Sequence, residues 1–193
     1  MAITTEQIKE LRELTGVSIM QCKKALEEAE GDLEKAKVAL AKISKAQADK
    51  KADRNLGAGT VASYIHLGGS VGSLVELACE TDFVSKNEEF QTLARDIAMQ
   101  VAAGSPLFLK MEDINEDDMA KAKELFMEEV EGKPEELKEQ IIKGKLDAYF
   151  GEKTLLEQDF IKDPSKKVKN LTDDAVQKFG ERVEIIRFER FAI

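Results

Sequence analysis

The stretch TVASYIHLGGSVGSLVELAC, residues 60–79, predicts a β-hairpin. Two runs in which apolar residues alternate with small or polar ones flank Gly68-Gly69, a pair that tolerates positive φ and so permits a tight two-residue turn. On the first run the alternation puts three large residues on one face: Val61, Ile65 and Leu67. The second run continues this alternation. One face of the hairpin is therefore apolar, and we expect another element to cover it.

The helix that follows the hairpin is predicted to provide this cover. Ser85 and Glu88 have the spacing of a capping box, which starts a helix. Apolar residues then recur with helical spacing at Phe90, Leu93, Ala94, Ile97, Ala98 and Val101. The chain ends in ERVEIIRFERFAI (residues 181–193), whose apolar residues change phase after Ile185, which predicts a bulge or a strand buried on both faces. A sheet backed by helices indicates an α+β fold.

The first 45 residues predict a separate module of three short helices. Thr4 with Gln7 and Ser18 with Gln21 form capping boxes, and Asp32 caps the third helix. Residues 46–58 are poor in large apolar side chains and are typical of a linker, the first part of which can continue the helix before it. The sequence therefore predicts an N-terminal module over residues 1–45, a linker over 46–58 and a core domain over 59–193.

A helical hairpin is predicted within the core domain, over residues 115–149. Two acidic helical stretches, 115–131 and 134–149, follow each other, and Pro134 opens the second. Between Lys110 and Glu139 there are 12 acidic and 5 basic side chains. Beyond this hairpin we expect a short strand around Leu155 and a short helix over 172–180 capped by Thr172.

Composition and charge restrict the function. The chain of 193 residues carries a net charge of −9, which disfavours binding to nucleic acid or to an anionic membrane. It shows no basic and apolar leader and no apolar run long enough to span a bilayer. Its two cysteines, Cys22 and Cys79, lie in no paired motif, so we expect reduced thiols and a cytoplasmic protein.

Residues that would indicate catalysis are scarce. The single histidine, His66, lies on the less apolar face of a predicted strand, where an exposed structural residue is the usual interpretation. His66, Cys22 and Cys79 do not have the spacing of metal ligands. Neither of the common nucleotide-binding glycine motifs occurs. We therefore expect no enzymatic activity, no bound metal and no cofactor.

Two apolar residues are left unexplained by the predicted core. Met20 lies on the face of the second helix that also carries Lys23, Lys24 and Glu27, and Phe83 precedes a helix start at which Val84 holds the hydrophobic staple position. Two interpretations are open. Tertiary packing hides both side chains, or they are exposed among polar neighbours, as a partner-binding surface needs.

Three motifs together resemble the bacterial elongation factor Ts family. They are LRELTGVSIMQCKKAL (residues 11–26), ETDFVSKNEEF (residues 80–90) and IIRFERF (residues 185–191), in that order. The resemblance covers essentially the whole chain. It implies an α+β fold with an N-terminal three-helix module like a ubiquitin-associated domain, a small antiparallel sheet backed by helices, and a projecting helical hairpin.

The resemblance also implies a function, that of guanine-nucleotide exchange factor for the GTPase elongation factor Tu. It assigns docking on the partner's GTPase domain to Arg12, Ile19 and Met20. It assigns the displacement of the partner's Mg²⁺, which bridges the GTPase and the nucleotide phosphates, to Thr81, Asp82, Phe83 and Val84. Loss of this ion weakens GDP binding, so that GTP can replace it.

The resemblance further implies a homodimer. The longest members of the family carry two related core units, whereas this chain carries one, so a second copy would supply the other and form a two-to-two complex with the GTPase. No cysteine lies in the final strand, so no intersubunit disulfide is expected there. Two other classes stay open: a ubiquitin-associated-like adaptor for another helical partner, and an enzyme with a bound cofactor or metal.

Overall fold

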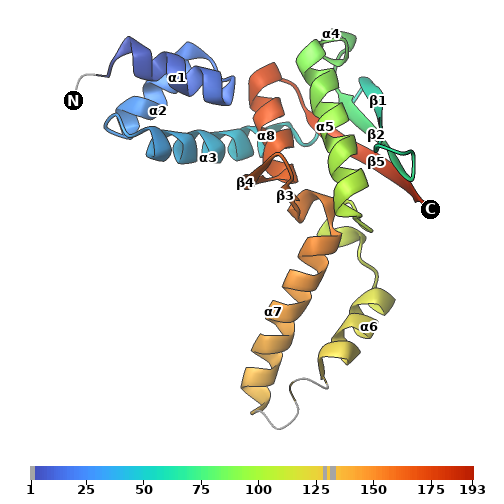
Figure 1. Cartoon of the computed structure of the whole chain (residues 1–193). Helices are drawn as coiled ribbons and strands as arrows, with labels where there is room; N and C mark the ends of the chain where they lie inside the picture. Colours follow the sequence, from blue (N-terminus) through green and yellow to red (C-terminus); the bar gives the residue numbers. More distant parts are fainter. Residues whose placement is uncertain (1–2, 128–129, 131–133) are drawn as a thin grey trace. The chain divides into compact units, whose positions relative to one another are not determined.

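Figure 1 shows the computed structural model of the chain, which describes residues 3–127, 130 and 134–193. Its elements are, in order, α1 (Thr5–Thr15), α2 (Ile19–Glu28), α3 (Leu33–Lys51), β1 (Ala58–Ile65), β2 (Val71–Cys79), α4 (Asp82–Ser85), α5 (Glu88–Gly104), η1 (Met111–Asp113), α6 (Glu116–Met127), α7 (Glu135–Lys153), η3 (Leu155–Glu157), β3 (Asp159–Phe160), β4 (Asp163–Lys167), α8 (Val168–Phe179) and β5 (Val183–Ala192). The end of the helix predicted over 115–131 lies outside the described residues.

The chain divides into two compact units, which are described separately below. The first contains the described residues up to Ala62, Val75–Arg95 and Lys169–Ile186. The second contains Ser63–Leu74, Asp96–Val168 and Arg187–Ile193.

The three N-terminal helices of the first unit form the expected module around an aliphatic core (Figure 1). This core is made by Leu11, Val17, Cys22, Ala25, Leu26, Ala29, Ala36 and Leu40. The helix starts follow the sequence signals: the Thr4–Gln7 capping box is present, Ser18 accepts from Gln21 N–H, and Asp32 accepts from two N–H groups of α3. The third helix continues to Lys51, into the segment expected as a linker.

The sheet has the strand order β1-β2-β5. The predicted hairpin is confirmed, but its connection is longer than two residues, because His66 N–H donates to Val71 O (2.8 Å) and residues 67–70 form the loop. Gly68 and Gly69 both have positive φ, +88° and +73°. The N–H of Ile193 donates to Ser70 O (3.1 Å), so β5 ends beside the start of β2 and runs antiparallel to it. The α+β prediction is confirmed.

The C-terminal half of α5 backs this sheet within the second unit. Ser73 Oγ on β2 donates to Ala98 O (2.6 Å), and Arg190 Nε on β5 donates to Ala102 O (3.0 Å). The face of β2 that carries Ser73 continues, by alternation, through the fully buried Val75 and Leu77. One face of the sheet is therefore covered by a helix, as predicted.

The prediction was wrong about the apolar residues of the first run of the hairpin, which comprises β1 and the start of the loop. Val61, Ile65 and Leu67 are exposed, and the half-buried residues of β1 are instead the small or polar ones between them. Alternation shows which residues share a face of a strand, but not which face a helix will cover. The final strand is likewise not buried on both faces, since Ile186 and Phe191 are exposed.

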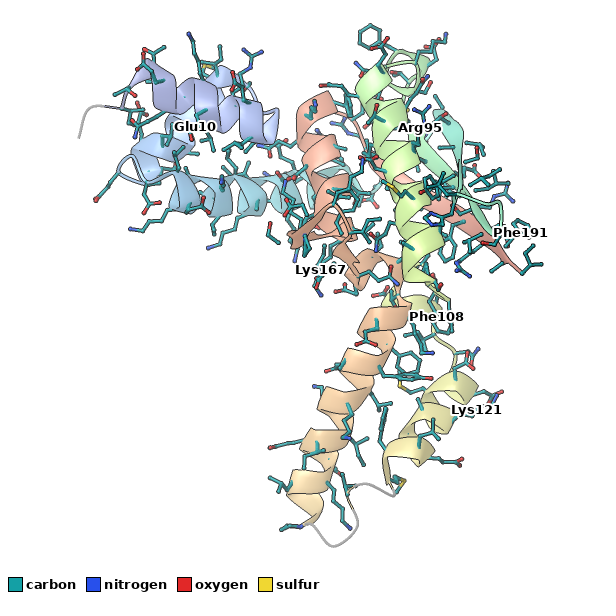
Figure 2. All side chains as sticks on the ribbon, viewed as in Figure 1. Glu10, Arg95, Phe108, Lys121, Lys167 and Phe191 are labelled. Carbon is teal, nitrogen blue, oxygen red and sulfur yellow. The ribbon has the colours of Figure 1, made fainter. Side chains whose placement is uncertain are left out.

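The helical hairpin of the second unit is held at its base and along its length by aromatic rings. Phe126 on α6 meets Tyr149 on α7 edge to face, with ring centroids 5.8 Å apart. At the base, where Figure 2 labels Phe108, the Phe108 ring packs edge to face against Phe150, with ring centroids 6.2 Å apart. The amide of Gln158 donates to the carbonyls of Gly104 and Glu152 near the ends of α5 and α7.

Two shorter elements differ from the predictions. Leu155 starts a turn of 3-10 helix rather than a strand, and α8 begins at Val168, four residues before the expected cap. Thr172 lies inside α8 and its hydroxyl donates to Lys169 O (2.8 Å) instead of capping the helix. In the part of the chain that the structure describes, no helix is both long and apolar enough to cross a bilayer.

Candidate protein-docking surface

The residues expected to dock on the partner lie where α1 ends and α2 begins. Gly16 ends α1 in the left-handed conformation (φ +68°), and its N–H donates to Arg12 O (2.7 Å). Ser18 then caps α2, so that Ile19 and Met20 occupy the first turn of that helix. Arg12 and Ile19 are exposed, and Met20 keeps 81% of its surface accessible. Arg12, Ile19 and Met20 therefore all lie close to the connection between α1 and α2, which we call the docking corner.

Leu14 is an additional apolar residue at this corner that the sequence analysis missed. It lies in the last turn of α1 and is 54% exposed, whereas Leu11 one turn earlier is fully buried. The available signal was a second leucine just before the helix-ending glycine. Leu14 therefore adds an exposed apolar side chain close to the connection between α1 and α2.

The second candidate segment, Thr81–Val84, is a single helical turn rather than a loop. The turn α4 comprises Asp82–Ser85, and Ser85 N–H donates to Thr81 O (3.2 Å). Phe83 is 82% exposed, whereas Val84 is 4% exposed. The helical turn therefore anchors Val84 in the unit and leaves the ring of Phe83 in solvent.

Asp82 lies beside Phe83 on the exposed side of the turn. Its Oδ2 is 2.6 Å from Lys86 Nζ, four residues later. The hydrogen bond from Lys86 lowers the pKa of Asp82, so this carboxyl group is ionised at neutral pH. The exposed part of the turn thus combines one aromatic ring, one carboxylate and one ammonium group.

The capping box predicted for Ser85 and Glu88 is absent. Ser85 belongs to α4, where its hydroxyl donates to Asp82 O (3.1 Å). The next helix begins at Glu88, and Asn87 Oδ1 accepts from Glu89 N–H (2.8 Å) in the capping position. The error arose because two N-cap residue types lie two positions apart. Val84 is buried although it does not form a hydrophobic staple. Phe83 takes part neither in a staple nor in a helix cap.

A lysine on α8 links the two candidate segments within the first unit. Lys178 Nζ is 2.8 Å from Glu89 Oε1 in the first turn of α5, just after the turn that carries Phe83. The same side chain lies against Gly16, where a methyl group would come within 3.2 Å of Nζ. The docking corner and the Phe83 turn are therefore both supported by α8.

A separate apolar surface lies on the uncovered face of the sheet in the second unit. It contains a groove of about 720 Å³. Arg190 and three serines line part of this groove, and its large apolar side chains are Ile65, Leu74, Phe191 and Ile193. Ile65 is 71% exposed and Phe191, labelled in Figure 2 near the end of β5, is 65% exposed. We refer to these four residues as the sheet-face patch. Exposed apolar patches of this kind mark interaction sites.

Cys22, Cys79 and His66 are the side chains that were considered as candidates for catalysis or metal binding. Burial raises the pKa of the Cys22 and Cys79 thiols, which keeps both protonated. His66 is exposed, and its Nδ1 lies 3.2 Å from the hydroxyl of Tyr64. Among the described residues no group of three or more His, Cys, Asp or Glu side chains is placed to bind a metal ion.

Comparison with known proteins gives one consistent result. The family described as Elongation factor TS matches residues 2–193. Elongation factor Ts of Thermodesulfovibrio yellowstonii is 48% identical, over 100% of this chain and 97% of that protein. Those of Thermotoga petrophila and Desulforamulus reducens are 45% and 47% identical, over 97% and 88% of their own lengths. The chain belongs to the elongation factor Ts family.

Proposed function

We propose that this protein is a guanine-nucleotide exchange factor for the GTPase elongation factor Tu. The observation that carries the proposal is the Phe83 ring, exposed on a short turn inside the motif ETDFVSKNEEF and adjacent to the buried Val84. A large apolar ring in solvent costs free energy in the unbound protein. That cost is removed when the ring is buried in a partner, so Phe83 suits an interface better than an unbound surface.

The proposed mechanism divides the work between two sites. Arg12, Ile19 and Met20 dock on the GTPase domain. The turn of Thr81, Asp82, Phe83 and Val84 then approaches the bound nucleotide, with Val84 as its buried anchor, and the inserted Phe83 ring shifts the groups that hold Mg²⁺. Because Mg²⁺ neutralises phosphate charge, its displacement weakens GDP binding without any contact between the factor and GDP.

Release of the factor follows from linkage. A factor that weakens nucleotide binding by a given ratio is itself bound more weakly, by the same ratio, when nucleotide is present. Fresh GTP therefore expels the factor, and no covalent step on this chain is needed. The protein is thus not an enzyme in the chemical sense and needs no cofactor. It would act in the cytoplasm, where its two unpaired thiols stay reduced.

The proposal assigns roles to segments of the chain. Residues 1–45 dock on the partner, residues 46–58 connect, and residues 59–193, including the helical hairpin over 115–149, form the core. The sheet-face patch would bind a second copy of the chain, giving a homodimer that binds two GTPase molecules. The net charge of −9 is the reason that we assign neither a nucleic acid nor a membrane as a direct partner.

The direct test measures release of fluorescent GDP from purified elongation factor Tu. We expect release to accelerate with the concentration of this protein and to reach a maximum. We also expect that added Mg²⁺ slows the accelerated reaction, because the ion competes with its own displacement. If GDP release is unchanged at a large excess of the protein, the proposed function is wrong.

A further inference from the structure

The turn that carries Phe83 is too short to hold its own direction. The turn α4 has four residues, and an isolated helix of that length is not stable in water. Its N-cap residue, Thr81, is extended and makes no side-chain capping bond to α4. The buried Val84 anchors the turn on one side, and contacts that hold Thr81 from outside the turn are needed to fix the direction of Phe83.

Glu181 supplies these contacts from the connection between α8 and β5. Its Oε2 accepts hydrogen bonds from Glu80 N–H (3.1 Å) and Thr81 N–H (3.0 Å), and its Oε1 accepts from the Thr81 hydroxyl (2.6 Å). Hydrogen bonds to a carboxylate are stronger than those between neutral groups. One side chain thus holds both the backbone and the side chain of the residue just before the turn.

The end of α8 places Glu181 for this role. Gly180 has a φ of +73°, and its N–H donates to Val176 O (3.0 Å), which closes the last turn of the helix. A residue in the left-handed conformation reverses the chain direction, and glycine adopts it without steric cost. Glu181 follows directly and leaves the helix toward Glu80 and Thr81.

Glu80 binds the opposite segment in return. Its Oε1 accepts from Arg182 N–H (2.6 Å) and from Arg54 Nη1 (3.2 Å). The Arg182 side chain donates to Arg54 O (2.6 Å). The Arg182 N–H, together with Arg54, holds the pKa of Glu80 below its ordinary value. Residues 80–81 and 181–182 are therefore each bound to the other's backbone, although about a hundred positions separate them.

We infer that Glu181 is a positioning residue for nucleotide exchange, which holds Thr81 so that Phe83 is presented to the partner in one direction. This inference rests on the proposed exchange function. A side chain held in its binding direction loses less conformational entropy on binding than a mobile one. Glu181 acts through Thr81 and Phe83 and need not touch the partner.

The test compares Glu181→Ala, Phe83→Ala and the double variant in full-length protein. GDP release is measured over a range of factor concentrations, which separates the maximal rate from the half-saturating concentration. We expect Glu181→Ala to lower the maximal rate by about tenfold. The half-saturating concentration should change little, because the docking corner that contains Met20 is intact. In the Phe83→Ala background, removal of Glu181 should have no further effect on the rate.

Asp96→Ala is the matched control. Asp96 bonds Lys162 at 2.6 Å, and like Glu181 it is half-buried. Loss of this carboxylate should leave the maximal rate unchanged. Glu181→Gln, which keeps one acceptor oxygen, should recover part of the rate lost in Glu181→Ala.

Different outcomes separate the inference from the function on which it rests. If the unmodified protein does not release GDP, the proposed function fails. If the unmodified protein is active, Phe83→Ala is slow and Glu181→Ala is normal, only the inference fails. Equal losses from Glu181→Ala with and without Phe83 would also overturn it, because the effect would then not pass through the ring. If Glu181→Ala does not fold, Thr81→Val replaces it, because this variant removes only the hydroxyl that Glu181 binds. It is compared with Phe83→Ala and the double variant in the same way, and the same results are expected.

Discussion

The docking residues of the first unit and the sheet-face patch of the second both expose apolar side chains, but in different surroundings. Phe83 is a single apolar group with Asp82 beside it, and Met20 forms a small apolar group with Ile19 among charged neighbours such as Lys23 and Lys24. The sheet-face patch instead combines several apolar side chains along one groove, which two glycines, three serines, Ala192 and Arg190 also line.

The difference indicates two kinds of partner. A single anchor in a polar surround suits a contact that must form and dissociate, because few residues then carry the binding energy. A groove with several large apolar side chains suits a lasting contact, since such interfaces are more apolar at their centre. This is why we propose the GTPase as the partner of the first surface and another copy of this chain as the partner of the second.

The largest effect is expected from a charge on the sheet-face patch. Ile65→Lys would place an ammonium group in an apolar contact, which costs several kcal/mol unless the charge is paired. We expect the dimer to weaken by more than about a hundredfold, and light scattering to report a mass near the 21.5 kDa of one chain. Unfolding of the monomer should change by less than about 0.5 kcal/mol, because Ile65 is exposed in one chain.

Val38→Lys is the control for this variant, because Val38 is an exposed β-branched residue on α3, outside the sheet. It should leave the mass in solution unchanged. If the unmodified protein is a monomer at micromolar concentration, the sheet-face patch does not bind a second copy of the chain and must have a different partner.

The next effect is expected from Phe83→Ala. We expect GDP release to fall by about 30-fold, which corresponds to about 2 kcal/mol of lost binding in the rate-limiting complex. Thermal unfolding should change by less than about 1 kcal/mol, because a ring that is 82% exposed contributes little to the core. If Phe83→Ala instead loses about 3–5 kcal/mol of stability and exchanges normally, the ring is a core residue. The dimer should persist in this variant.

Asp173→Asn should change the stability of the first unit and neither of the two surfaces. Burial, with the charges of Asp174 and Asp49, raises the pKa of Asp173 on α8 to about 6, and Lys45 and Lys169 offset part of this. The folded protein therefore holds more protons than the unfolded chain between about pH 4 and pH 6, so stability decreases as the pH rises through this window.

Asp173→Asn removes this cost. We expect a gain of about 1–3 kcal/mol in the free energy of unfolding at pH 7.5, which shrinks as the pH falls below 6 and vanishes near pH 4. Denaturant unfolding at several pH values measures it. A gain that is independent of pH would show that the carboxyl is not the cause. GDP release and dimer mass should stay unchanged, because neither surface contains Asp173.

Local signals in the sequence predicted much of this fold. Thr4 with Gln7, and Asp32, identified helix starts because a cap and its partners lie within four residues. The spacing of apolar residues likewise identified α5. Signals failed where two competed, as with Ser85 and Asn87, or where a strand was polar, as with β4, whose sequence is DPSKK.

Non-local contacts could not be predicted in this way. Nothing near Glu181 indicates that its carboxylate binds Thr81, since a hundred positions separate the two residues. Backbone N–H groups are also the same in almost every residue, so the sequence does not show which of them a carboxylate will bind. The exposure of Ile65 was missed for a related reason, because alternation along β1 does not show which face is covered. The resemblance identified Phe83, but its support from Glu181 was visible only in the structure.

The smallest effect is expected from Asp82, the charged neighbour of Phe83. Its folded pKa is lowered by Lys86, so its contribution to stability is present above the ordinary carboxyl pKa and is lost only as the pH falls through the folded pKa. Between pH 6 and pH 8 the group stays charged, and exchange should show no pH dependence from it. Asp82→Asn keeps the shape and removes the charge. We expect a few-fold slower GDP release, which approaches the unmodified rate at high salt because exposed charges are screened. If the loss is equally large at all salt concentrations, shape rather than charge is what the partner recognises at Asp82, and Phe83 is not the only anchor of the turn.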